Sequence, residues 1–208
     1  MSVEAVLFFL ASVAVISLSG VLMPGPVFAV TITCGYNDRQ AGWKIALGHA
    51  LVELPIIVGI FFGLSALLRD DAIFGIIGLL GGSLLLYMGW DMVRTRKEIV
   101  TSCDIHYKDP FWAGVMTTAS NPAWLIWWAT IGAALITTAV TFGWWMLPLF
   151  AFVHITCDMI WEGLIALTVF DTKEKWDHRW HQHLIAGSGV LMIAFAMMFI
   201  LNALNILL

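Results

Sequence analysis

The sequence is dominated by long apolar runs separated by short polar connections. Six runs are nearly uncharged, and each reaches the length of about 20 residues that a helix needs to cross the hydrocarbon core of a bilayer. We therefore predict an all-α polytopic membrane protein with one transmembrane domain, residues 1–208. The predicted spans are residues 5–34, 43–68, 72–93, 111–137, 143–170 and 184–207.

The basic residues divide the connections into two classes. Nine of the ten Lys and Arg residues fall in the first, third and fifth connections, and only Arg69 falls on the other side. Because basic connections stay in the cytoplasm, this distribution predicts a cytoplasmic-membrane protein with both termini outside. An even number of spans also requires both termini to lie on the same side of the membrane, so the span count and the charges agree.

That topology divides the chain into two halves of opposite orientation. Residues 1–94 and 110–208 each contain three predicted helices, and the polar stretch 95–109 joins them as a cytoplasmic connection. Helices one to three start outside, whereas helices four to six start inside. Inverted three-helix repeats are typical of secondary transporters, so corresponding features are expected in the two halves.

Composition agrees with a protein that is embedded in a lipid bilayer. Hydrophobic residues make up 61% of the chain and charged residues 12%, and the mean hydropathy is +0.91. The net charge of -4 is carried mostly by the connections, and it gives no indication of a nucleic-acid partner. Several of the 11 Trp residues lie near predicted helix ends, as expected for interfacial aromatic belts.

Each half contains a proline-bearing break inside a long apolar run. The first run would form about 45 Å of helix, too long for one straight span of a ~30 Å core, and it contains Pro24, Gly25 and Pro26. Helix four has Asn121 and Pro122 at the corresponding place. Backbone groups freed by proline cannot face lipid, so they must face protein or water. One such site could be a simple kink, but the matched pair favours discontinuous helices 1 and 4. Their half-helix N-termini suit a carboxylate or another anionic group.

A histidine followed by an acid recurs in helices two and five. His49 and Glu53 are four residues apart, as are His154 and Asp158, and both members of one pair are offset by 105 residues from those of the other. This spacing places each pair on one helix face. Glu162 extends the second face by one turn, although it could also lie near the cytoplasmic end and be solvated. Either histidine alone would more often be a packed core residue, but the repeated pair indicates a functional site near the midplane.

The acids of these pairs have no basic partner within the predicted spans, because Lys and Arg occur only at the segment ends. A charged carboxylate at the midplane costs at least ~2.5 kcal/mol, so it must be protonated, pair with histidine, or meet an external cation. Proton coupling, a cationic group on a substrate and a metal ion all remain open. In the last case the ligands of a divalent transition-metal ion would be His49, Glu53, His154 and Asp158.

Several motifs together resemble the lysine-exporter family, LysE-type, which includes the RhtB-type exporters of homoserine and threonine. The motifs are 20-GVLMPGPVFAV-30, 41-AGWKIALGHA-50, 81-GGSLLLYMGWDMVR-94, 111-FWAGVMTTASNPAW-124 and 184-LIAGSGVLMIAFAMMF-199, which follow one another over nearly the whole chain. The resemblance implies export of amino acids or similar small solutes, energised by an ion gradient. It supports functional roles for Pro24, Gly25, Pro26, Asn121, Pro122 and Asp158.

The chain departs from the family pattern at the expected site. A basic residue often follows the Asn-Pro pair in the family, but Ala123 stands there in this sequence. Many members carry an acid directly after the helix-two glycine, whereas this chain has His49, with Glu53 one turn later. The identity of the substrate therefore cannot be taken over from the family.

The sequence thus predicts a secondary exporter of small amino-acid-like solutes that works by alternating access, as an antiporter coupled to protons or cations and without a cofactor. The expected substrate site comprises Pro24, Gly25, Pro26, Asn121 and Pro122, and the expected coupling site comprises Glu53, Asp158, His49, His154 and Glu162. The histidines would relay or tune protonation. The rival interpretation is a divalent transition-metal transporter. A membrane enzyme fits least, because no nucleophile motif or HExxH accompanies the pairs, and a homodimer is left open.

Overall fold

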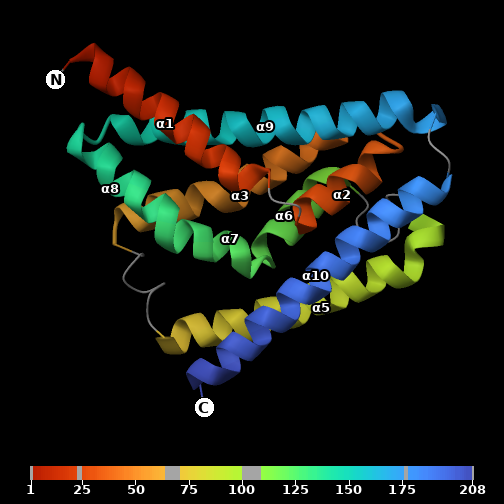
Figure 1. Ribbon diagram of the computed structural model, residues 1–208. Helices are drawn as coiled ribbons and strands as arrows, with labels where there is room; N and C mark the ends of the chain where they lie inside the picture. Colours follow the sequence, from red (N-terminus) through yellow and green to blue (C-terminus); the bar gives the residue numbers. More distant parts are fainter. Residues whose placement is uncertain (1, 23–24, 64–70, 100–108, 176–177, 208) are drawn as a thin grey trace.

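The computed structural model describes residues 2–22, 25–63, 71–99, 109–175 and 178–207, and the secondary structure of these residues is helical throughout (Figure 1). Among the described residues five stretches are long and apolar enough to cross a membrane, against six predicted spans, so the chain is a polytopic helical membrane protein. They are Val3–Val21, Ala41–Phe61, Ala123–Thr141, Met146–Lys175 and Ile185–Leu207. The helices are α1 (Val3–Val21), α2 (Pro26–Gly35), α3 (Ala41–Phe61), α5 (Asp71–Ile99), α6 (Pro110–Ala119), α7 (Pro122–Trp127), α8 (Ala133–Thr141), α9 (Met146–Thr172) and α10 (His178–Leu207).

Several helix ends differ from the predicted segments. The second predicted span was expected to reach residue 68, but α3 ends at Phe61 and is followed by Gly63 with a φ of 101°. α5 continues to Ile99, so the first part of the predicted connection 95–109 is helical. The polar stretch before residue 184 is also helical from His178 onward. Hydropathy marks the part of a helix that lipid covers, whereas the backbone hydrogen-bond ladder continues beyond the bilayer.

The first apolar run is interrupted between α1 and α2. Gly25 is extended, with φ -143° and ψ -168°, and Pro26 occupies the first position of α2. Proline is favoured there because the first turn of a helix needs no amide donor at that position. Pro24, the other proline of the predicted break, lies outside the described residues.

A second interruption separates α6 from α7. The Asn121 side chain accepts a hydrogen bond from the Ala123 amide, which caps α7, and Pro122 is the first residue of the new helix. α7 then passes through a π-helical turn, Trp128–Gly132, into α8. In both interruptions a residue with extended backbone angles is therefore followed by a proline that starts the next helix.

Glycines bring α3 into backbone contact with two other helices. A Cβ on Gly48 would lie 2.1 Å from the Phe111 carbonyl oxygen of α6, and one on Gly42 would lie 2.0 Å from the Glu162 carbonyl oxygen of α9. Hydrogen is the only substituent that these contacts admit, so α3 is fixed between α6 and α9.

α5 and α10 pack side by side and form a pair that lies beside the other helices (Figure 1). Gly78 and Gly89 of α5 face α10, where added Cβ atoms would lie 3.1 Å from Ala203 Cβ and 2.7 Å from the Gly189 carbonyl oxygen. The small-residue spacing of this helix therefore serves close helix packing.

The chain ends lie toward one end of the bundle, and the junctions that follow α2 and α9 lie toward the other (Figure 1). At the second end Arg39 pairs with Asp171 at 3.1 Å, and Lys44 pairs with Asp38 at 2.6 Å. Partial burial alone would raise the pKa of Asp38, but hydrogen bonds from the Lys44 ammonium and the Gln40 amide hold it below its usual value. The charged residues of the first and fifth connections thus meet at one end.

Candidate functional site

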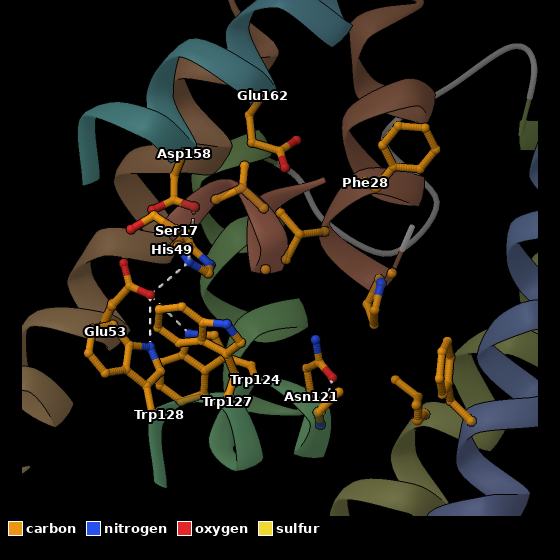
Figure 2. Close-up of a pocket in the computed structure, with 18 of the residues that line it drawn as sticks. Ser17, Phe28, His49, Glu53, Asn121, Trp124, Trp127, Trp128, Asp158 and Glu162 are labelled. Atoms are coloured by element: carbon orange, nitrogen blue, oxygen red, sulfur yellow. Dashed lines mark hydrogen bonds and ion pairs between the residues drawn. The ribbon is translucent and has the colours of Figure 1, made fainter. Parts of the chain in front are cut away.

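A cavity of about 110 Å³ lies among α1, α2, α3, α5, α7, α9 and α10 (Figure 2). One ordered water needs roughly 10–15 Å³ of such space, so the cavity has room for a small solute or several waters. In Figure 2 the carboxylates of Glu53, Asp158 and Glu162 lie on one side, and Asn121 and Phe28 lie on the other. The two histidine–acid pairs, which the sequence places on different helices, thus share one cavity.

Glu53 of α3 contacts two indoles and two imidazoles of the cavity. Its side chain is only 1% exposed, and its Oε1 accepts hydrogen bonds from the indole N–H groups of Trp124 at 3.1 Å and Trp128 at 3.0 Å. Its Oε2 has no hydrogen-bond partner among the described residues. One oxygen is therefore fixed by two indole donors, while the other is a buried acceptor whose capacity the described residues leave unused.

Those indole donors come from one face of α7 and the π-helical turn. Trp124 and Trp128 are four residues apart, and Gly132 leaves room for the Trp128 ring, because an added Cβ would lie 2.3 Å from that ring. Trp128 is fully buried, so its indole belongs to the protein interior.

His49 of α3 contacts a hydroxyl through one ring nitrogen and the acids through the other. Its Nδ1 lies 2.7 Å from Oγ1 of Thr118, and that hydroxyl also lies 2.7 Å from the Gly114 carbonyl. A hydroxyl can both donate and accept, so Thr118 can accept from an N–H on Nδ1 of His49. The other nitrogen, Nε2, lies 3.1 Å from Oε1 of Glu53 and 4.0 Å from Oδ1 of Asp158.

His154 of α9 is held by a hydroxyl in the same way. Its Nδ1 lies 2.6 Å from Oγ of Ser17 on α1, and its Nε2 lies 3.3 Å from Oε1 of Glu53. The ring stacks on Trp127 with centroids 5.2 Å apart, and on Phe150 at 6.1 Å. Two aromatic rings and a carboxylate therefore fix the position of this imidazole.

Asp158 and Glu162 continue along the same face of α9. Oδ2 of Asp158 lies 3.7 Å from Nε2 of His154 and makes no hydrogen bond to any described residue. Glu162 accepts a hydrogen bond from Oγ1 of Thr31 on α2. Because Glu162 is 5% exposed, the alternative that it is a solvated residue near a helix end is wrong.

The described residues that line the cavity include no Lys or Arg. Three carboxylates and two imidazoles, all in their charged forms, give 2 − 3 = −1. A single added proton or cationic group would balance this charge, which is otherwise costly in a low-dielectric surrounding.

Both helix interruptions also reach the cavity. Gly25, Pro26 and Asn121 contribute to its lining. The N-terminus of α2 has no side-chain cap, whereas that of α7 is capped by Asn121. The predicted site residue Pro122 is the first residue of α7, and the predicted site residue Pro24 lies outside the described residues.

Sequence patterns did not single out Ser17, Thr31 or Thr118, nor the tryptophans that bind Glu53. The only available signal was the dense run 124-WLIWW-128 immediately after the break. Its residues place three indole rings beside the acids.

The profile of the LysE type translocator family matches residues 18–203. The chain belongs to this family. Its members are membrane transporters and not enzymes, which confirms the resemblance seen in the motifs and the transporter class predicted from them.

Two full-length relatives agree with this family membership. The chain is 25% identical over 197 residues to the Bacillus subtilis (strain 168) protein named "Putative amino acid efflux protein YcgF", covering 90% of this chain and 93% of that one. It is 21% identical over 207 residues to an "Uncharacterized membrane protein" of Haemophilus influenzae (strain ATCC 51907 / DSM 11121 / KW20 / Rd), covering 92% and 95%. No solved structure matches the chain.

Proposed function

We propose that this LysE-family transporter exports small amino-acid-like solutes across the cytoplasmic membrane by alternating access, in exchange for protons or cations. The observation that carries the proposal is a cavity lined by acids with unsatisfied carboxylate oxygens and by an uncapped helix N-terminus. Such a cavity is complementary to a zwitterion. The name of the B. subtilis relative, an amino acid efflux protein, points to the same substrate class.

The ammonium end of the substrate would bind the carboxylates. Oδ2 of Asp158 and Oε2 of Glu53 have no hydrogen-bond partner among the described residues. The cavity carries a formal charge of −1 when all of its acids and histidines are charged, so one ammonium group restores neutrality. A proton or another cation could do the same on the return path, and that exchange would couple export to the ion gradient, with His49 and His154 as partners of the acids.

The carboxylate end would bind at the interrupted helices. The amides of Val27 and Phe28 lie in the first turn of α2, where no side chain caps them, and the helix dipole adds partial positive charge. Asn121 of the second interruption lines the same cavity. These groups take the place of the basic residue that often follows the Asn-Pro pair in the family.

Alternating access would follow from two inverted repeats, residues 1–94 and 110–208. In this scheme α1–α2 corresponds to α6–α8, and α3 corresponds to α9. The His49–Glu53 and His154–Asp158 pairs then occupy equivalent positions, and rocking of one repeat against the other would expose the shared cavity to each side in turn. The positive-inside rule places the first, third and fifth connections in the cytoplasm and both termini outside.

Uptake of labelled amino acids into inside-out membrane vesicles, driven by an imposed ion gradient, tests this function. We expect Asp158→Asn to abolish gradient-driven uptake, whereas Asp171→Asn, the same change on the same helix at its exposed end, should retain it. Full activity of Asp158→Asn would remove this acid from the mechanism. Absence of uptake for every amino acid by the wild-type chain would overturn the proposed substrate class.

A further inference from the structure

We propose that His49, Glu53, His154 and Asp158 also form a binding site for a divalent transition-metal ion of the zinc type. This inference goes beyond amino-acid export, because it concerns binding of the ion itself and does not depend on which solute is transported. The ion and a substrate ammonium would use the same carboxylate oxygens, so the two occupants exclude each other.

The donor atoms lie at spacings close to those of ligands around a transition-metal ion. Nε2 of His49 lies 3.1 Å from Oε1 of Glu53, and Nε2 of His154 lies 3.3 Å from the same oxygen. Asp158 oxygens lie 4.0 Å and 3.7 Å from these two nitrogens. Tetrahedral zinc with bonds of about 2.0–2.1 Å holds its ligand atoms roughly 3.3 Å apart. The ligand atoms of His49, Glu53 and Asp158 lie within 4.8 Å of one another, and the ring of His154 would move closer to complete a four-ligand site.

The hydrogen bonds of the imidazoles orient them for this role. Thr118 can accept from Nδ1 of His49, and with the proton on Nδ1 the Nε2 lone pair would be available to an ion that replaces the contact with Glu53. Ser17 can accept a hydrogen bond from Nδ1 of His154 and would leave its Nε2 free in the same way. A metal-ligating histidine characteristically donates its second ring N–H to such an outer partner.

Each of the two carboxylates has one oxygen that could accept a further interaction. Oε2 of Glu53 and Oδ2 of Asp158 lack hydrogen-bond partners among the described residues, although the two side chains are 1% and 9% exposed. The indoles of Trp124 and Trp128 fix the other oxygen of Glu53. Two imidazoles with two carboxylates suit zinc, nickel or cobalt, whereas calcium and magnesium prefer oxygen ligands alone.

Cobalt(II) binding to the purified full chain tests the site, with the affinity tag removed and amino acids excluded from the buffer. We expect one ion per chain and the visible absorption bands of a tetrahedral complex, which zinc should displace. Thr118→Val removes the hydroxyl that contacts His49 and should weaken cobalt binding by about 10–100-fold. His49→Gln removes a metal ligand itself and should weaken binding by more than that. Size-exclusion profiles would show whether each variant remains folded.

The surface histidine His183 provides the control, because its side chain is exposed on α10 and lies outside the cavity. His183→Gln should leave the cobalt spectrum and affinity unchanged. Binding that is lost in His183→Gln but retained in His49→Gln would overturn the proposal, as would octahedral bands or no binding at millimolar cobalt. These readouts involve no transport, so they distinguish failure of the metal site from failure of the proposed export function.

Discussion

Nε2 of His154 on α9 lies 3.3 Å from Oε1 of Glu53 on α3, closer than the 3.7 Å that separates it from Asp158 on its own helix. Each sequence-defined pair is therefore also joined to the other half of the chain, since His49 reaches Asp158 at 4.0 Å. Contacts within one helix would survive a movement of one repeat against the other, but the cross-helix contacts would not. In the proposed alternating-access scheme, the cross-helix contacts would therefore differ between the two conformations.

Neutralising Glu53 should destabilise the protein as well as stop transport. Glu53→Gln removes the anion that two indoles and two imidazoles surround, and breaking a buried ionic pair costs about 3–5 kcal/mol. For a domain of this size that corresponds to a Tm lowered by roughly 6–20 °C. Differential scanning fluorimetry in detergent would measure the Tm of Glu53→Gln and of the wild-type protein. Glu174→Gln, an exposed acid after α9, is the control and should leave the Tm unchanged; an equal Tm in both variants would refute the central role of Glu53.

The close contact between α3 and α6 predicts a large effect from the smallest substitution. In Gly48→Ala the new methyl would lie 2.1 Å from the Phe111 carbonyl oxygen, so the helices must separate. Overpacking of this kind costs about 1–3 kcal/mol or more, and His49, the next residue, would move with the backbone. We expect a lower Tm together with weaker transport.

Gly187→Ala on α10 is the matched control for this change, because a Cβ there meets nothing within 4 Å. Replacing glycine by alanine inside a helix should stabilise it slightly, by about 0.5–1 kcal/mol. Thermal shifts of the same sign in both variants would show that helix propensity, and not the α3–α6 contact, decides the outcome.

The sequence predicted the titratable residues of the cavity more fully than their partners. Carboxylates and histidines inside apolar runs are conspicuous, and their repeated spacing of four indicated a shared face. Thr31 and Thr118 carry no such signal, because hydroxyls inside helices commonly bond to their own backbone four residues earlier. Both do so here, to Val27 and Gly114, and only the packing of distant helices reveals that each also contacts Glu162 or His49.

The positive-inside arrangement predicts an externally located C-terminus. Nine basic residues lie in the first, third and fifth connections, against one elsewhere, and Figure 1 places both chain ends toward the same end of the bundle. Alkaline phosphatase fused after Leu208 should therefore be active in a bacterial host, whereas a fusion after Lys97 should be inactive. The reverse pattern would invert the proposed orientation, and activity in both would contradict the six-span topology.

The carboxylate end of the proposed site can be tested by changing only the charge of Asn121. Aspartate caps a helix as well as asparagine does, so Asn121→Asp should retain the hydrogen bond to the Ala123 amide and a wild-type Tm. Its negative charge would face the substrate carboxylate, and two unit charges ~4 Å apart repel by about 4 kcal/mol near a protein surface. We therefore expect the KM for amino acids to rise at least about tenfold, equivalent to ~1.4 kcal/mol. A decarboxylated amine should not be penalised in the same vesicle assay, and an unchanged amino-acid KM in Asn121→Asp would place the carboxylate elsewhere.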